Sequence, residues 1–261
     1  PVYDFAKKLN IQVRCPISLA NNEELNHLKT LKPDVVVVVA YGKILPPDFL
    51  NLDKIFFLNV HASLLPKWRG AAPIQRAIMN MDKETGISIM KIVEKLDAGP
   101  VLLKSKIKIN KESNYHDISE KMSTLGAKLI LDALNLIQSG KAYFTDQNED
   151  EATYAKKIDK KESKVNWNEN ASNIIAKINA LSPTPGSWFD LSGSRVKIIR
   201  AKEVNITGKP GVIINENFTI ACSKNAIQIL ELQKEGKKKI LSKEFLKGNK
   251  LEKGLNLLAD V

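Results

Sequence analysis

The sequence predicts an α/β protein: a Rossmann-like, mostly parallel sheet with flanking helices, followed by a smaller OB-like β-barrel. The apolar run at 35–39 has the pattern of a strand buried on both faces, and a second, short run at 55–60 repeats the pattern. Helix-compatible stretches separate such strands, as they do in parallel sheets. Several short β-type runs with glycine-containing turns come later and favour a small barrel. The 261 residues are enough for two domains.

The first part of the chain, residues 1–144, supplies the predicted α/β domain. Its helices are expected at 1–9, 71–81 and 115–138, the last an amphipathic helix that covers one sheet face and is closed by Gly140. Its strands are expected at 35–39 and 55–60, both buried, at 86–93, and at 101–109, where apolar residues alternate with lysine. We assign the run at 35–39 wholly to the core.

A polar segment at 145–164 separates the two parts. It carries an acidic cluster followed by a basic one and lacks apolar periodicity, so we interpret it as the interdomain linker. Residues 165–261 then form the predicted β-barrel domain. Its elements are expected to be a helix at 171–180, a turn at 182–186 and strands at 196–199, 211–214, 218–221 and 226–232.

The net charge of +11 has two interpretations. A charge of this size favours anionic partners such as nucleic acid. However, only five of the forty cationic residues are arginine, and a lysine-rich chain can also arise from biased codon usage. Neither half of the chain carries the whole excess, so both interpretations stay open.

Cysteines and histidines argue against metal and disulfide chemistry. Cys15 and Cys222 are far apart without metal-ligand spacing, which favours a reducing compartment and argues against a disulfide scaffold or zinc site. The three histidines, His27, His61 and His116, are too scattered for a metal set. The longest apolar run is too short to cross a bilayer, so we expect a soluble protein.

Three residues are candidates for catalysis: Asn59, His61 and Asp97. Asn59 and His61 end the second predicted strand, where α/β sheets form ligand sites, and alternate residues of a strand point the same way. An amide and an imidazole can stabilise a developing oxyanion, and histidine moves protons near neutral pH. Asp97 lies in a loop between two predicted strands, where a carboxylate can orient an imidazole.

Each candidate also has a structural interpretation. An asparagine and a histidine at a strand end are commonly a hydrogen-bonded pair without catalytic function. The sequence DAGP at 97–100 is ordinary turn chemistry. The apolar residues after His61 fit plain packing, and Arg69 fits a surface cation.

Longer motifs surround these residues and change the balance. They are NVHASLLP at 59–66, LDAG at 96–99, WRGAAPIQR at 68–76, AYGKILP at 40–46, ETGISIM at 84–90, TYAKKI at 153–158 and VNW at 165–167. Together they resemble the folate-dependent formyltransferase superfamily, and most of all its branch that acts on initiator methionyl-tRNA. The resemblance extends past the polar segment and covers nearly all of the chain.

This resemblance implies transfer of the formyl group of 10-formyltetrahydrofolate, as co-substrate, to the α-amine of initiator methionyl-tRNA. Asn59, His61 and Asp97 would be catalytic, without a metal or a covalent intermediate. The barrel domain would contact the tRNA. We expect a monomer in the cytoplasm of a bacterium or an organelle, with no membrane contact. The residues implied for the folate site are Ser63, Leu64, Leu65 and Pro66.

Two other functions remain as alternatives. A related formyltransferase acting on a sugar-nucleotide amine or on glycinamide ribonucleotide would share the same three residues, but AAPIQ at 71–75 and the basic second domain favour tRNA. A nucleic-acid-binding protein without catalysis would leave the three residues unexplained. Because the family's first strand, helix and basic loop do not precede Pro1, we expect an N-terminally incomplete first domain.

Overall fold

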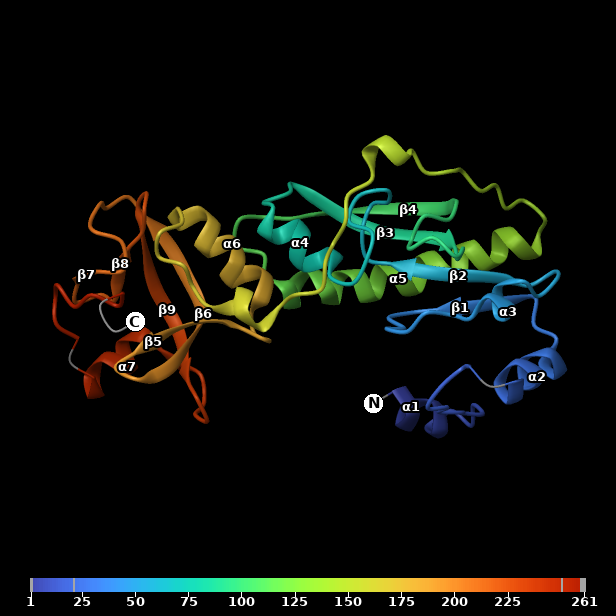
Figure 1. Ribbon diagram of the computed structural model, residues 1–261, viewed down its shortest axis with the longest axis horizontal. Helices are drawn as coiled ribbons and strands as arrows, with labels where there is room; N and C mark the ends of the chain where they lie inside the picture. The colour runs from blue at the N-terminus through green and yellow to red at the C-terminus, as the bar shows by residue number, and fades with distance from the viewer. Residues whose placement is uncertain (1, 21, 250, 259–261) are drawn as a thin grey trace.

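The computed structural model describes residues 2–20, 22–249 and 251–258. Pro1, where the first helix is predicted to begin, lies outside these residues. Two sheets lie at opposite ends of an elongated molecule, and helices α4 (Pro73–Met79) and α6 (Ala171–Leu181) lie side by side between them (Figure 1). The first sheet and the loop between its third and fourth strands contain all three candidate catalytic residues.

The first sheet is mixed, so the prediction of a mostly parallel sheet is wrong. Its strands, in spatial order, are β1 (Val35–Val38), β2 (Phe56–His61), β3 (Glu84–Lys91) and β4 (Val101–Lys108). Only β1 and β2 are parallel, whereas β3 is antiparallel to both β2 and β4. The loop at 92–100 is too short for a parallel crossover, which needs a dozen or more residues, so β3 and β4 form a hairpin.

Strand β1 also differs from its prediction. It lies at the sheet edge and pairs with β2 alone among the described strands, and it ends at Val38. Val37 is 39% exposed and Val39 is 61% exposed, so the run at 35–39 does not lie wholly in the core. An apolar run is buried on both faces only when other elements pack against both faces of its strand, and β1 is covered only in part.

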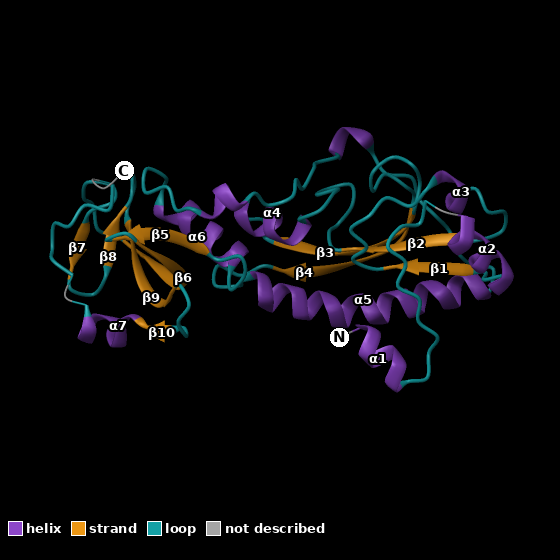
Figure 2. Ribbon diagram, turned by 60° about the horizontal axis from the view of Figure 1, so that its bottom comes forward, coloured by secondary structure: helices purple, strands orange, loops and turns teal. Residues whose placement is uncertain are grey.

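The predicted long helix is confirmed as α5 (Tyr115–Gln138), which runs along one face of the first sheet (Figure 2). Asn114 and Asp117 form a reciprocal capping box at its start. Gly126 lets the helix approach β2 and β3, because a Cβ there would lie 3.1 Å from the Val60 side chain. A separate hydrophobic cluster lies between α2 (Asn22–Leu31), α3 (Pro47–Leu50) and Phe57 of β2. The short helix α1 (Val2–Lys8) precedes them.

The second sheet is antiparallel. Its strands are β5 (Ser187–Leu191), β6 (Ser194–Val204), β9 (Ala226–Lys234), β8 (Thr219–Ala221) and β7 (Ile213–Asn215) in spatial order, with β10 (Ile240–Leu241) on β9 and helix α7 (Ser242–Gly248) after it. Within the described residues no ladder joins β5 to β7, so the predicted closed barrel is not observed. A row of aromatic rings fills the core of this part: Trp167, Phe189, Phe218 and Phe245.

Candidate active site

Strand β2 places Asn59 and His61 on the sheet face away from α5. Leu58 and Val60, the alternate residues of the strand, belong to the core beneath that helix. Because strand side chains alternate between the two faces, Asn59 and His61 lie together on the opposite face. The sequence prediction that these two residues share one face therefore agrees with the strand observed.

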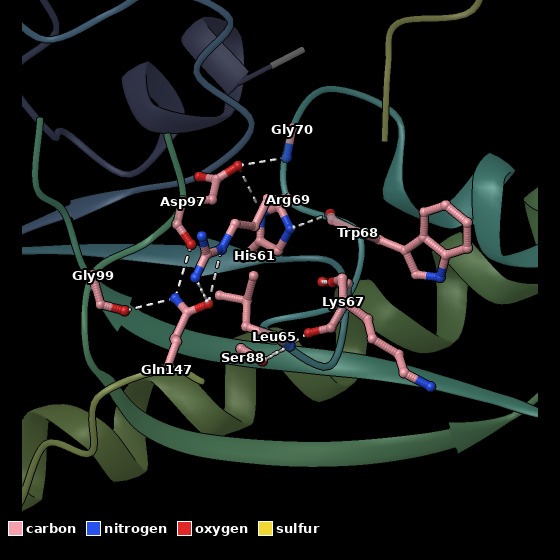
Figure 3. Close-up of polar contacts among 11 residues, drawn as sticks. His61, Leu65, Lys67, Trp68, Arg69, Gly70, Ser88, Asp97, Gly99 and Gln147 are labelled. Atoms are coloured by element: carbon pink, nitrogen blue, oxygen red, sulfur yellow. Dashed lines mark hydrogen bonds and ion pairs between the residues drawn. The ribbon is translucent and has the colours of Figure 1, made fainter. Parts of the chain in front are cut away.

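The imidazole of His61 lies between a carbonyl and a carboxylate (Figure 3). Its Nε2 is 2.9 Å from the carbonyl oxygen of Trp68. A carbonyl can only accept a hydrogen bond, so Nε2 carries the hydrogen of this contact. Nδ1 lies 3.7 Å from Oδ2 of Asp97, and His61 is only 5% exposed. The ring orientation is thus set by Trp68, which leaves Nδ1 as the nitrogen that faces the carboxylate.

Asp97 reaches this position from the β3–β4 loop. Its Oδ2 accepts a hydrogen bond of 2.8 Å from the backbone N–H of Gly70, in the loop that follows β2. Its φ of +46° lies in the left-handed region, where Asp is among the more tolerant residues. One carboxylate therefore joins the β3–β4 loop to the loop after β2 and to the imidazole.

The Asn59 side chain differs from those of His61 and Asp97 in its exposure and its contacts. It is partly exposed, and among the residues that the structure describes its amide makes no hydrogen bond. A partly exposed amide can donate to an incoming oxygen without first breaking an internal bond. The structure thus places His61 and Asp97 near each other, and Asn59 beside His61 on the same face of β2.

The segment predicted to line a folate site is fixed by hydrogen bonds to side chains of β3 and β4. The Ser88 hydroxyl donates to the Ser63 carbonyl at 2.7 Å and accepts from the Leu65 N–H at 3.1 Å. The Lys104 ammonium donates to the Leu65 carbonyl. Ser63 is 0% exposed and Leu65 is 1% exposed, so their side chains belong to the interior. Pro66 is also buried, so Leu64 is the one residue of this segment that remains partly accessible.

The polar segment packs against the candidate site, which the sequence did not reveal. It contains two short 3₁₀ turns, Glu149–Glu151 and Lys160–Ser163, and Arg69 pairs with the first of them. The Arg69 guanidinium is 0% exposed and binds both carboxylate oxygens of Glu149, at 3.1 and 2.8 Å. The alternative interpretation of Arg69 as a surface cation is therefore wrong. The scarcity of arginine in this lysine-rich chain was the available signal.

The Arg69–Glu149 ion pair makes the stability of the protein sensitive to acid. Arg69, with Lys95 as a second cause, lowers the pKa of Glu149 from 4.5 to about 2. A lowered folded-state pKa contributes stability above about pH 4.5, and this contribution is lost as the pH falls towards 2. We expect Glu149→Gln to lower the free energy of unfolding at neutral pH and to flatten its dependence on pH in the acid range. Urea unfolding at several pH values measures both effects, and parallel curves for the two proteins would contradict the prediction.

Comparisons with known proteins identify the family of both parts of the chain. The family model for formyl transferase matches residues 2–134, and the model for the formyl transferase C-terminal domain matches residues 157–250. The methionyl-tRNA formyltransferase of Pelagibacter ubique is 47% identical over 256 residues, which cover 97% of this chain and 83% of that protein. The methionyl-tRNA formyltransferase of Bradyrhizobium diazoefficiens is 41% identical over 258 residues, with the same two coverages.

The chain belongs to the methionyl-tRNA formyltransferase family. Its activity is that of a methionyl-tRNA formyltransferase. The resemblance inferred from the motifs is therefore confirmed by relatives that are 41–47% identical over 97% of the chain.

Solved structures share the fold of this methionyl-tRNA formyltransferase at low identity. A methionyl-tRNA formyltransferase from Clostridium thermocellum aligns with a TM-score of 0.57 at 19% identity over 79% of this chain and 88% of that one. WlaRD, a sugar 3N-formyl transferase, aligns with a TM-score of 0.67 at 18% identity, over 91% and 82% of the two chains. Because the sugar enzyme superposes at least as well, the fold does not distinguish the acceptors, whereas sequence identity does.

The described residues of this family member were expected to hold neither a metal site nor a membrane span. They contain no group of three or more His, Cys, Asp or Glu residues arranged to hold a metal ion. No helix among them is both long and apolar enough to span a membrane.

In this family member Gly99 lies in the same loop as Asp97, and its backbone packs closely against strand β3. A Cβ at this position would collide with the carbonyl oxygen of Lys91, so the backbone approaches here as only glycine allows. We expect Gly99→Ala to lower the free energy of unfolding by about 1–3 kcal/mol or more, and to lower the activity by displacing Asp97. Gly42→Ala is the control, because a Cβ at Gly42 would meet nothing within 4 Å. Equal melting temperatures for the two variants would refute the prediction.

Proposed function

We propose that this chain transfers the formyl group of 10-formyltetrahydrofolate to the α-amine of the methionine carried by initiator tRNA. The observation that carries the proposal is the 47% identity to a methionyl-tRNA formyltransferase over 97% of the chain. Folate as the formyl donor is supported by proteins of the same fold. HypX from Aquifex aeolicus has been solved with tetrahydrofolic acid, and WlaRD with 5-N-formyl-THF.

Asn59 and His61 stabilise the oxygen of the formyl group in this proposal. The amine attacks the formyl carbon, a new C–N bond forms, and the carbonyl oxygen becomes an oxyanion. The Asn59 amide is a free donor, and a protonated His61 offers Nδ1–H because Nε2 is occupied by the Trp68 carbonyl. Two such donors act together on a charge that is absent from the ground state, so they accelerate the reaction rather than only binding the substrate.

Asp97 accepts the proton that the attacking amine loses, directly or through a water. Its carboxylate is partly exposed, with 15% of the side chain accessible, and its second oxygen has no contact with the Gly70 N–H. The oxyanion then re-forms the C=O bond and the bond from carbon to the folate nitrogen breaks. The proton held by Asp97 passes to that nitrogen, directly or through a water, so tetrahydrofolate leaves and the carboxylate is restored. Every step uses the side chains of Asn59, His61 and Asp97.

The segment of Ser63, Leu64, Leu65 and Pro66 forms the proposed wall of the folate site. Its backbone is fixed by Ser88 and Lys104, which suits a rigid surface for a flat ring system. Because Ser63, Leu65 and Pro66 are buried, Leu64 is the residue of this wall that a folate can contact directly, and the other three support it.

Residues 165–261 form the proposed tRNA-contacting domain, after a catalytic domain at 1–144 and a connecting segment at 145–164. The separate matches of the two family models, at 2–134 and 157–250, support this division. Lys237, Lys238 and Lys239 are exposed in the turn between β9 and β10, where they can meet phosphates. We also propose a cytoplasmic location, since both Cys15 and Cys222 are free thiols.

The identity of the acceptor is tested by offering the enzyme three different amines. The full-length protein is incubated with labelled 10-formyltetrahydrofolate and with methionyl-tRNA, an amino-sugar nucleotide or glycinamide ribonucleotide. We expect label in methionyl-tRNA alone, and a loss of about 10²- to 10³-fold in kcat for Asn59→Ala. Transfer to the sugar nucleotide, or to glycinamide ribonucleotide, in place of methionyl-tRNA would overturn the assignment.

A further inference from the structure

The polar segment lies across the loops that carry the proposed catalytic residues, and Gln147 lies where they meet (Figure 3). Its side chain contacts Arg69 on one side and the β3–β4 loop on the other. Gln147 is partly buried and comes from a segment 50 residues away from Asp97 in the sequence. This long-range contact was not expected for a linker.

The orientation of the Gln147 amide follows from its partners. Arg69 can only donate hydrogen bonds, so the oxygen Oε1 must face it, at 3.1 Å from Nε and 2.9 Å from the terminal NH2 group. The amide nitrogen Nε2 then faces two carbonyl oxygens, which can only accept: Asp97 at 2.8 Å and Gly99 at 2.7 Å. All polar groups of the Gln147 side chain are engaged, and neither a carboxylate nor an ammonium would satisfy this set.

These two bonds hold the backbone on both sides of Ala98 and therefore fix the direction of the Asp97 side chain. Asp97 has a left-handed backbone, which the surrounding contacts must maintain. Arg69 is itself anchored, because its N–H donates to the Thr153 carbonyl at 2.8 Å and its carbonyl accepts from Ala155 at 2.7 Å. The loop that carries Asp97 and the loop that carries Gly70, its partner, are thus both attached to the same polar segment.

We propose that Gln147 is a positioning residue for formyl transfer, which holds the Asp97 carboxylate at the distance from His61 that the reaction requires. The inference rests on the catalytic role proposed for Asp97. The Gln147 amide does not act on the substrate itself, because both of its ends are already bonded within the protein. Its effect is therefore on the rate of the chemical step rather than on binding.

The test is Gln147→Glu in the full-length protein, with Glu162→Gln as the matched control. Gln147→Glu keeps the shape and an oxygen for Arg69 but replaces the two donors with an acceptor that faces two carbonyls. Glu162→Gln weakens the other arginine contact of the same segment, with Arg76 at 2.7 and 3.0 Å, and does not touch the Asp97 loop. We measure kcat and KM for methionyl-tRNA and for 10-formyltetrahydrofolate.

We expect Gln147→Glu to lower kcat by about ten- to a hundredfold with both KM values changed little, and Glu162→Gln to change kcat by less than about twofold. In an Asp97→Asn background, measured by single turnover, Gln147→Glu should add almost no further loss. Should Gln147→Glu not fold, Gln147→Asn, which is one methylene too short to reach both carbonyls, should give the same pattern.

A kcat for Gln147→Glu equal to that of the control, or a loss confined to KM, would overturn the positioning role. The positioning role would also be wrong if Gln147→Glu lowered the rate as much in the Asp97→Asn background as in the wild type. An Asp97→Asn variant with wild-type kcat would instead overturn the role of Asp97 in the proposed function, and the positioning role with it.

Discussion

Replacement of His61 by alanine is expected to lower kcat for formyl transfer by about 10²- to 10⁴-fold with little change in KM. In the proposed mechanism the imidazole donates a hydrogen bond to the oxyanion, which exists only after the amine has attacked, so removal of the imidazole should slow the chemical step. Removal of the ring also leaves the Trp68 carbonyl without its 2.9 Å partner, so a modest loss of stability should accompany the loss of rate. Steady-state kinetics with saturating methionyl-tRNA measure the first effect, and thermal unfolding measures the second.

His116→Ala is the control for this experiment. His116 is near the start of α5, outside the group of residues around the end of β2. Its replacement should leave kcat and KM unchanged. If His61→Ala kept more than about a tenth of the wild-type kcat, the proposed role of the imidazole would be wrong.

Replacement of Asp97 by asparagine is expected to lower kcat by a similar factor, about 10²- to 10⁴-fold, while the protein stays folded. Asparagine retains an oxygen that can accept the 2.8 Å bond from Gly70, and it tolerates the left-handed backbone of this position. It cannot accept a proton from the amine, and it lacks the negative charge that faces Nδ1 of His61. The measurement is kcat together with the melting temperature.

Asp190→Asn offers a matched control for Asp97→Asn. Asp190 in β5 also accepts a 2.8 Å hydrogen bond from a glycine N–H, that of Gly193, but in the second sheet. Both variants should melt close to the wild type, and only Asp97→Asn should lose activity. Equal activities would show that Asp97 serves the turn and not the reaction, which is the structural interpretation that the DAGP sequence allows.

Local sequence patterns predicted the elements whose form depends on nearby residues. The helical spacing of apolar residues located α5 over the range observed. The apolar run at 55–60 located β2, and with it the positions of Asn59 and His61. Strand direction did not follow in the same way, because pairing depends on how the chain returns to the sheet. The short connection at 92–100 was the local indication that β3 and β4 are antiparallel.

The contacts around Asp97 could not be predicted, because they join residues far apart in the sequence. The pairing of Arg69 with Gln147 and Glu149 spans 78 to 80 residues, and no spacing rule reaches across such a distance. Composition marked the polar segment as a linker, since charged side chains usually lie in solvent. Here that segment instead contacts the buried Arg69 and the loop that carries Asp97, so it packs against the candidate site.

The most direct test of a shared catalytic centre is a single-turnover measurement of formyl transfer for His61→Ala, Asp97→Asn and the combined variant, with methionyl-tRNA and 10-formyltetrahydrofolate. If the two side chains act as one unit across their 3.7 Å separation, the combined variant should be little slower than the slower single variant. Losses that multiply in the combined variant, or single variants with wild-type rates, would contradict a shared catalytic centre at the end of β2.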